Sequence, residues 1–167
     1  MSKIVFITGA SSGIGKSIAT YLHDRGFKVY GTSRNPQKVN APFQMVALDV
    51  TNQESIKKAV EEVITAEGKI DVLINNAGKG ITGPIEDTPT EEMKDNFNTN
   101  FFGVIDVVKE VLPYMRKQQS GTIINTTSIA GYMGLPFRGI YSASKGALEL
   151  VTEALSMEVK SFGIKVV

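Results

Sequence analysis

Residues 3–15 read KIVFITGASSGIG, and this stretch decides the fold. Its first six residues form a short, β-rich apolar run, as expected for a strand that is covered on both faces. Ile14, Ile18 and Leu22 then recur every four residues, which predicts a helix ending near Gly26. A glycine-rich turn between a strand and a helix predicts a phosphate-binding loop, because the first N–H groups of a helix lack partners and attract an anion.

The three glycines of this loop have separate expected roles. Gly9 makes a tight turn, Gly13 lets the backbone approach a pyrophosphate, and Gly15 lets the helix pack closely against the strand. The spacing is G-x3-G-x-G instead of the commoner G-x-G-x-x-G. An alternative is that the glycines only turn the chain. The loop residues predicted to bind a dinucleotide are Gly9, Ser11, Ser12, Gly13, Ile14 and Gly15.

Strands and helices alternate along the rest of the chain. Further strands are predicted at 28–33, 44–48, 71–76, 121–128 and 164–167. Helices are predicted after the capping-box sequence TNQE at 51–54, from a capping Thr90 to about Lys117 with a bend at Pro113, and after Pro136. Because strand–helix–strand units cross over with one hand, this order predicts an α/β fold. We expect a doubly wound parallel sheet with helices on both faces, in a single domain over 1–167.

Composition excludes several classes of function. The 167 residues carry a net charge of +1 with no basic run, so no nucleic-acid partner is expected. No cysteine is present, which excludes disulfides and thiol catalysis and suits a reducing cytoplasm. No apolar run approaches the roughly 18 residues of a membrane span, and neither a secretory leader nor metal-ligand spacing is visible. We therefore expect a cytoplasmic protein with no membrane partner and no metal.

Three further motifs follow the glycine loop in order: NNAG at 75–78, NFFG at 100–103 and YSASK at 141–145. Together with TGASSGIG at 8–15, they closely resemble the short-chain dehydrogenase/reductase family in its single-domain form. The resemblance covers essentially the whole chain and implies a Rossmann fold. Members of that family continue beyond a sixth strand, so the fold is expected to be truncated there.

The resemblance assigns Asn100, Ser128, Tyr141 and Lys145 to the catalytic site. Tyr141 and Lys145 are four residues apart and so share one face of a helix. A phenol ionises near pH 10 and a nearby ammonium favours the phenolate, which lets a tyrosine exchange a proton with a carbonyl or alcohol oxygen. The family's serine hydrogen-bonds that oxygen, its lysine also bonds the nicotinamide ribose, and its asparagine holds a water that relays protons. Each residue also has an ordinary structural explanation, because a lone Y-x3-K occurs by chance in many helices.

The end of the second strand is expected to select the nucleotide. It holds Thr32, Ser33 and Arg34, and no carboxylate that would bond the ribose of NAD. The Arg34 guanidinium can fork onto a 2′-phosphate and Ser12 adds a donor, so NADP(H) is the predicted cofactor. The alternative is that Arg34 is an ordinary solvated residue. By resemblance, the other cofactor-binding residues are Asp49, Val50, Asn76, Ala77, Gly78, Tyr141 and Lys145.

These features predict an NADP(H)-dependent oxidoreductase that transfers a hydride between nicotinamide and a carbonyl or secondary alcohol. Apolar residues at 80–81 and 132–137 flank the predicted chemistry and favour a hydrophobic small-molecule substrate, as in the steroid- and retinol-type branch that the chain is most similar to. The alternatives are a non-catalytic nucleotide sensor or scaffold, and an enzyme like a sugar epimerase or dehydratase. The two long helices are apolar on more than one face, and the family generally forms dimers or tetramers through them. A homodimer or homotetramer is therefore expected.

Overall fold

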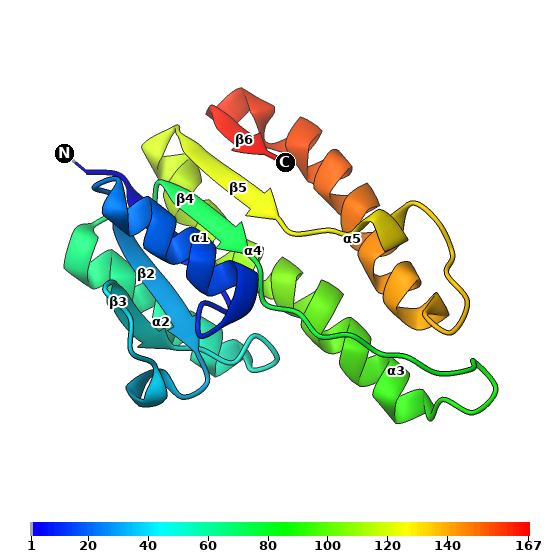
Figure 1. The fold of residues 1–167 in the computed structure, drawn as a ribbon. Helices are drawn as coiled ribbons and strands as arrows, with labels where there is room; N and C mark the ends of the chain where they lie inside the picture. Colours follow the sequence, from blue (N-terminus) through cyan, green and yellow to red (C-terminus); the bar gives the residue numbers. More distant parts are fainter. Residues whose placement is uncertain (1) are drawn as a thin grey trace.

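A wholly parallel six-stranded sheet forms the centre of the computed structural model, which describes residues 2–167 (Figure 1). The strand order is β3-β2-β1-β4-β5-β6, so the chain winds outward from β1 in both directions. The doubly wound α/β fold predicted from the sequence is thus confirmed. The strands are Ile4–Ile7 (β1), Lys28–Ser33 (β2), Gln44–Ala47 (β3), Val72–Asn75 (β4), Gly121–Asn125 (β5) and Ile164–Val166 (β6).

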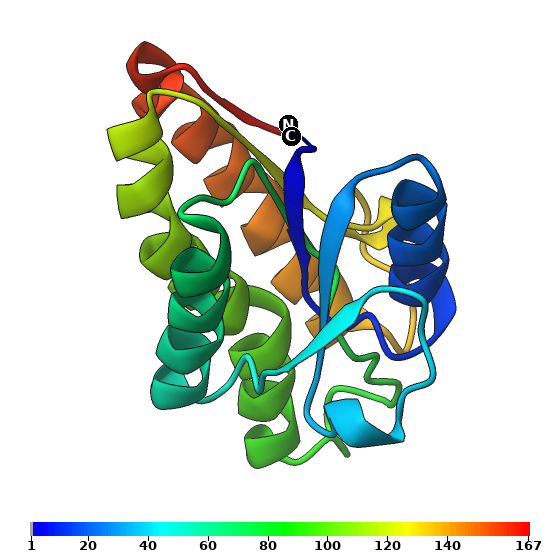
Figure 2. The same cartoon turned by 90° about the vertical axis from the view of Figure 1, so that its left-hand side faces the viewer.

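Helices cover both faces of the sheet, as Figure 2 shows, with α1 on one side and α2, α4 and α5 on the other. The α-helices are Gly13–Asp24 (α1), Gln53–Glu67 (α2), Thr90–Phe97 (α3), Gly103–Gln118 (α4) and Gly139–Glu158 (α5). A π-helical turn, η2 (Asn98–Phe102), joins α3 to α4. Short 3-10 turns lie at Pro36–Lys38 (η1), Ile129–Gly131 (η3) and Lys160–Phe162 (η4).

The register of the strands explains why two cores form. Phe6 of β1 lies opposite Tyr30 of β2 and Leu73 of β4, and Leu73 lies opposite Ile123 of β5. This buried row belongs to the core that also contains side chains of α2 and α4. The neighbouring residues in the strands point the other way and pack against α1 in a second core. Strands buried on both faces are continuously apolar, which is why the sequence of β1 identifies it so clearly.

Two helix starts differ from the predictions. The cap of α2 is Asn52, whose Oδ1 accepts a hydrogen bond of 2.9 Å from the backbone N–H of Ser55. Thr51, predicted to be part of the capping box, instead donates its N–H and its hydroxyl to the carboxylate of Asp49. Thr90 is the first residue of α3 and not its cap, because Pro89 occupies that position. An asparagine with extended backbone caps as well as a threonine, so sequence spacing alone could not choose between adjacent candidates.

The long helix predicted at 90–117 changes geometry earlier than Pro113. The helix remains α-helical through that proline, whereas η2 takes the wider π turn. The helix passes very close to the loop after β3 there, since a Cβ on Gly103 would lie 2.6 Å from the carbonyl oxygen of Val50. A π turn within an α-helix often marks a functional position, and this one carries Asn100.

The fifth strand is shorter than predicted. It ends at Asn125, so Ser128 is not at the end of the strand but begins the turn η3. One ladder bond continues past the strand, from the Thr126 N–H to the Asn75 carbonyl. The Thr126 carbonyl then accepts a hydrogen bond from the side chain of Lys145 on α5.

Candidate functional site

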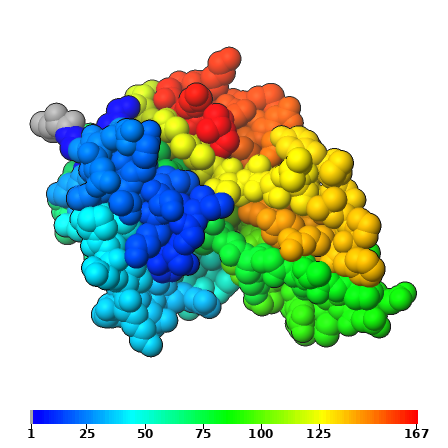
Figure 3. Space-filling view, viewed as in Figure 1, coloured from blue at the N-terminus to red at the C-terminus, as the bar shows by residue number. Residues whose placement is uncertain are grey.

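A cavity of about 900 Å³ opens at the carboxyl ends of β1, β2, β3 and β4. It lies beside the point where the strand order reverses around β1, which is where open α/β sheets bind their ligands. In Figure 3 the surface is indented where the blue and cyan N-terminal half meets the green segment. Twelve of the predicted cofactor-binding residues line this cavity: Gly9, Ser11, Ser12, Gly13, Ile14, Gly15, Arg34, Asp49, Val50, Asn76, Ala77 and Gly78.

The glycine loop packs so closely against the segment after β4 that no Cβ would fit at two of its glycines. Gly9 has φ +71°, and a Cβ there would lie 2.8 Å from the Cα of Ala77. A Cβ on Gly15 would lie 2.3 Å from both the carbonyl oxygen of Gly9 and the side-chain nitrogen of Asn76. Asn76 donates from that nitrogen to the carbonyls of Thr8 and Gly9, at 3.1 and 3.0 Å. The side chain of Asn76 therefore shapes the loop, and the loop admits no larger residue at either glycine.

The start of α1 faces the cavity with its donors free. Ser12 precedes the helix with extended backbone, and its side chain makes no capping bond to α1. No acidic side chain lies in the first turn to compete for these groups. The unpaired N–H groups and the positive end of the helix dipole can therefore receive a phosphate.

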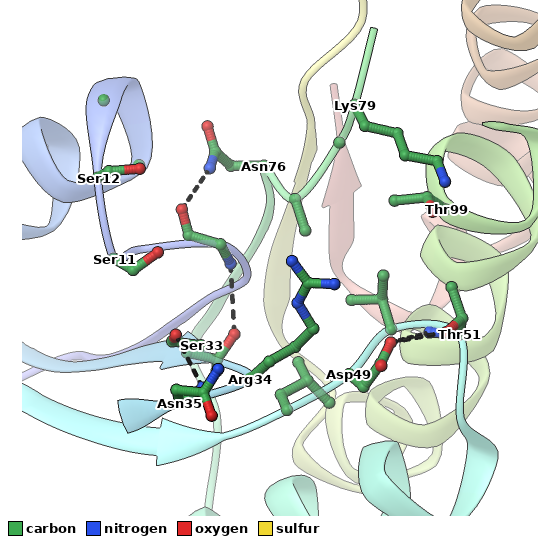
Figure 4. Close-up of a pocket in the computed structure, with 18 of the residues that line it drawn as sticks. Ser11, Ser12, Ser33, Arg34, Asn35, Asp49, Thr51, Asn76, Lys79 and Thr99 are labelled. Carbon is green, nitrogen blue, oxygen red and sulfur yellow. Dashed lines mark hydrogen bonds between the residues drawn. The ribbon is translucent and has the colours of Figure 1, made fainter. Parts of the chain in front are cut away.

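A cation and a carboxylate border the other end of the cavity. Figure 4 shows the guanidinium of Arg34 projecting between the glycine loop and the segment that carries Asp49. Among residues 2–167, Arg34 takes part in none of the ion pairs or side-chain hydrogen bonds. The hydrogen bonds from Thr51 hold the pKa of Asp49 below its usual range, with a weaker contribution from Arg34. The carboxylate stays charged and fixed in direction, while the guanidinium is free to meet an anion.

The cavity also includes residues that the sequence analysis missed, and Lys79 is the most prominent. It follows Gly78 directly, and its side chain points toward Thr99 in Figure 4. Its ammonium pairs with the carboxylate of Asp95 on α3. Proximity to the NNAG motif was the only signal available, because α3 comes within reach of Lys79 only through the tertiary fold.

Asn100 is completely buried on the π turn and bonds to protein groups on every side. Its Oδ1 accepts from the Lys79 N–H at 2.9 Å, and its Nδ2 donates to the Lys79 carbonyl at 2.9 Å. The same nitrogen lies 3.3 Å from the hydroxyl of Ser144, which donates to the Tyr141 carbonyl at 2.8 Å. The role that this geometry gives the side chain is to join the segment after Gly78 to Ser144 in the second turn of α5.

Lys145 is 5% exposed and reaches the junction between α5 and the cavity. Its Nζ donates to the Thr126 carbonyl at 2.7 Å and lies 3.8 Å from the place that a Cβ on Gly78 would occupy. Burial lowers the pKa of the ammonium by stripping it of water. The ammonium has three N–H groups and one protein acceptor, which leaves donors for a ligand.

Ser128 and Tyr141 are half-buried and lie on separate elements. The hydroxyl of Ser128 accepts from the Ala130 N–H at 3.2 Å and caps η3. That turn packs on α5, since a Cβ on Gly131 would lie 3.0 Å from the backbone of Lys145. Within the described residues, 2–167, no hydrogen bond joins the hydroxyl groups of Ser128 and Tyr141. The fold thus brings η3 onto the helix of the tyrosine and lysine, and both hydroxyls remain available to a ligand.

Two loops beyond the cavity expose apolar side chains. Tyr132, Met133 and Phe137 are exposed on the segment after η3, and Ile85 is exposed on the segment after Lys79. The two segments are tied by a hydrogen bond of 2.9 Å from the Gly83 N–H to the Phe137 carbonyl. Residues 2–167 contain no cluster of metal-ligating side chains, and none of their helices is long and apolar enough to cross a membrane.

A family model described as short chain dehydrogenase matches residues 3–167. The 3-ketodihydrosphingosine reductase of Bacteroides thetaiotaomicron is 53% identical over 164 residues, covering 98% of this chain and 61% of that protein. The chain spans about three fifths of the length of this relative and of two other curated relatives that it matches.

Solved structures agree with the match to the short chain dehydrogenase family model. A short-chain dehydrogenase from Streptomyces avermitilis superposes with a TM-score of 0.96 at 36% identity, covering 100% of this chain and 64% of that one. ElxO with NADP bound superposes with a TM-score of 0.92 at 31% identity, covering 99% of this chain and 71% of that one. NAD+-bound xylitol dehydrogenase superposes with a TM-score of 0.90 at 32% identity, covering 98% of this chain and 67% of that one. Similar structures therefore hold either nicotinamide dinucleotide.

Proposed function

The chain belongs to the short-chain dehydrogenase family of oxidoreductases, and we propose from that premise that it uses NADP(H) to interconvert a carbonyl and a secondary alcohol on a hydrophobic substrate. The observation that carries the proposal is a cavity lined by an unpaired Arg34 and a free helix start at one end and by Gly78, beside the ammonium of Lys145, at the other. The reductase from B. thetaiotaomicron, whose name specifies a ketone on a sphingoid chain, supports a long-chain ketone as the substrate.

The residues present fit a phosphorylated dinucleotide. The N–H groups at the start of α1 would hold the pyrophosphate, and the hydroxyl of Ser12 would add a donor to a 2′-phosphate. The guanidinium of Arg34 would hold a 2′-phosphate, and Asp49 with the backbone of Val50 would hold the adenine. The chemistry that the dinucleotide supplies when bound is hydride transfer, and the protein supplies orientation and proton handling.

The proton is assigned to Tyr141. In the reducing direction its hydroxyl gives a proton to the carbonyl oxygen of the substrate, and in the oxidising direction it removes one from the alcohol. Lys145 lies one turn further along the same helix, so its positive charge stabilises the phenolate that remains. The Ser128 hydroxyl donates a hydrogen bond to the same oxygen and stabilises the charge that develops there. The side chain of Asn100 holds Gly78 and Lys79, which form the wall between the cavity and α5, in place.

We further propose that the protein assembles as a homodimer or homotetramer through the helices that follow the cavity. Phe102 of η2 and Leu150 and Met157 of α5 expose large apolar side chains at 52, 70 and 68%. Exposed apolar surface on adjoining elements is typical of subunit contacts. Sedimentation equilibrium checks this: a monomer at micromolar concentration would contradict it.

Calorimetric titration with NADPH and with NADH tests the central proposal. We expect NADPH to bind at least about tenfold more tightly, because hydrogen bonds to a charged group contribute about 1.5–3 kcal/mol. Arg34→Ala should bring NADPH to the level of NADH. Lys38→Ala, which removes an exposed cation from η1 outside the cavity, is the matched control and should change neither constant. Tighter binding of NADH would overturn the role of Arg34, and binding of neither would overturn the dinucleotide site.

A further inference from the structure

Every polar group of Lys79 is held by one helical turn, although Lys79 itself lies in a segment with no regular structure. Its N–H donates to Asn100, its carbonyl accepts from two asparagine amides, and its ammonium pairs with Asp95. The partners span only residues 95–100, the end of α3 and the start of η2. Such complete bonding is unusual for a loop, since backbone groups of loops commonly bond to water.

Asn96 is the buried centre of this arrangement. It is 1% exposed, and its Nδ2 donates to the Lys79 carbonyl at 3.0 Å. Its Oδ1 lies 3.3 Å from the Nδ2 of Asn100, one helical turn further on. The two amides therefore share one carbonyl and also bond to each other. Asparagine is poorly suited to the interior of a helix and to burial, so its place here needs a compensating set of bonds, which these contacts supply.

We propose that Asn96 is a positioning residue of the active site, which acts through Asn100 and the Lys79 carbonyl to hold Gly78 against Lys145. The inference rests on the proposed function, because Gly78 and Lys145 are where the cavity meets the catalytic helix. A Cβ on Gly78 would lie 3.2 Å from the Oδ1 of Asn100 and 3.8 Å from the Nζ of Lys145. The wall is therefore only as well placed as the asparagine pair that holds it.

The geometry predicts which half of the cofactor depends on Asn96. The start of α1, Arg34 and Asp49 lie outside the bonds that Asn96 makes, and they form the part of the cavity assigned to adenosine and phosphates. Gly78 and Lys145 lie at the end assigned to the nicotinamide ribose. Loss of Asn96 should therefore weaken the full dinucleotide and spare a ligand that carries only its adenosine half.

The test compares NADPH with 2′,5′-ADP by calorimetry in three proteins: the unchanged protein, Asn96→Leu and Asn98→Leu. Leucine has nearly the shape of asparagine and cannot donate. Asn98 lies in η2 with its side chain exposed, so its replacement is a matched control. We expect Asn96→Leu to bind NADPH at least tenfold more weakly and 2′,5′-ADP within twofold of the unchanged protein. Asn98→Leu should change neither.

A second variant keeps the inference falsifiable if leucine prevents folding. Asn96→Asp replaces the donating amide with a carboxyl group, which donates to the Lys79 carbonyl only when protonated. Its affinity for NADPH relative to the unchanged protein should therefore recover as pH falls from 8 to 5, whereas affinity for 2′,5′-ADP should keep a constant ratio.

The outcomes separate this inference from the proposed function. Equal losses for both ligands, or no loss for either, would overturn the positioning role while leaving the dinucleotide site intact. Failure of the unchanged protein to bind either ligand would overturn both. A loss confined to NADPH, with recovery at low pH in the aspartate variant, would support the inference.

Discussion

The cavity and the two loops beyond it are built in opposite ways. Around the glycine loop, backbone and side-chain hydrogen bonds tie β1, β2 and β4 together, and glycines sit where no Cβ would fit. The segments that carry Tyr132 and Ile85 have exposed apolar side chains and are tied to each other by a single backbone bond from Gly83. The difference fits the proposed function, in which the first region binds a cofactor of fixed shape and the second covers the apolar surface of a substrate.

Tyr141, to which the proposed function assigns proton transfer, should give the largest effect. Tyr141→Phe removes the proton donor but leaves the ring, so turnover should fall about 10²–10⁴-fold, the usual contribution of general acid–base catalysis. Binding of NADPH should stay within about threefold. Oxidation of NADPH with a 3-ketosphinganine substrate, followed by absorbance, measures the first and calorimetry the second. Unchanged turnover would exclude Tyr141 as the proton donor, whereas NADPH binding without turnover in the unchanged protein would favour a nucleotide sensor.

The tightly bonded region should tolerate no added atoms. Gly15→Ala places a methyl group 2.3 Å from the carbonyl oxygen of Gly9, so the loop must move. We expect NADPH binding to weaken about 10–100-fold and unfolding to become easier by about 1–3 kcal/mol, the usual cost of overpacking. Gly80→Ala is the matched control, because a Cβ there meets nothing within 4 Å. If both alanine variants bind NADPH normally, the glycine loop is less constrained than its geometry indicates.

The apolar loops should affect the substrate alone. Phe137 is 62% exposed and has φ +61°, so Phe137→Asn removes the ring while keeping a residue that accepts this backbone. We expect KM for a long-chain ketone to rise about tenfold, since burying such a side chain contributes about 1.5–3 kcal/mol when complete. Tyr21→Asn, which removes an exposed ring from α1 outside the cavity, is the control and should leave KM unchanged. A rise in the Kd for NADPH instead would mean that the loop serves the cofactor.

The smallest effect is expected on protein stability, from the buried ammonium of Lys145. Burial depresses the pKa of Lys145 in the folded state, so between that value and its ordinary pKa the unfolded chain holds more protons and stability rises with pH. Lys145→Met removes the free-energy cost of burying the ammonium. The melting temperature should therefore rise by a few degrees at pH 7, although the Thr126 carbonyl loses its donor. The gain should shrink as pH approaches 10. Scanning calorimetry across that range checks it; a variant less stable at every pH would show that the hydrogen bond outweighs the burial.

Local patterns predicted most of the fold and of the cavity. The strand–glycine–helix sequence at 3–15 dictates its own conformation, and each other strand or helix carries its own periodicity, so their order could be read directly. The twelve predicted cavity residues come together because they all follow the ends of parallel strands or begin the helix after one. Such placement is a consequence of topology, which the sequence pattern contains.

The parts that sequence could not predict depend on contacts between distant segments. Asn96 and Lys79 are 17 residues apart and carry no motif in common, so their hydrogen bond emerges only when α3 packs against the segment after β4. The π turn at Asn100 has no local sequence signal, and α4 remains α-helical through Pro113, where the sequence predicts a bend. The sequence predicts Ser128 at a strand end because β-rich residues run up to it, but the strand ends at Asn125 and the Thr126 carbonyl bonds to Lys145 of a distant helix.

The bonds around Lys79 also have a consequence for how this position can vary during evolution. The site uses the N–H and carbonyl of residue 79, and these are the same in every amino acid except proline. The ion pair of its side chain with Asp95 is exposed and such pairs contribute little to stability, so the side chain at position 79 can vary more readily than Asn96 and Asn100. Among descendants of this sequence, we expect many residue types and no proline at position 79, beside two asparagines that hardly change.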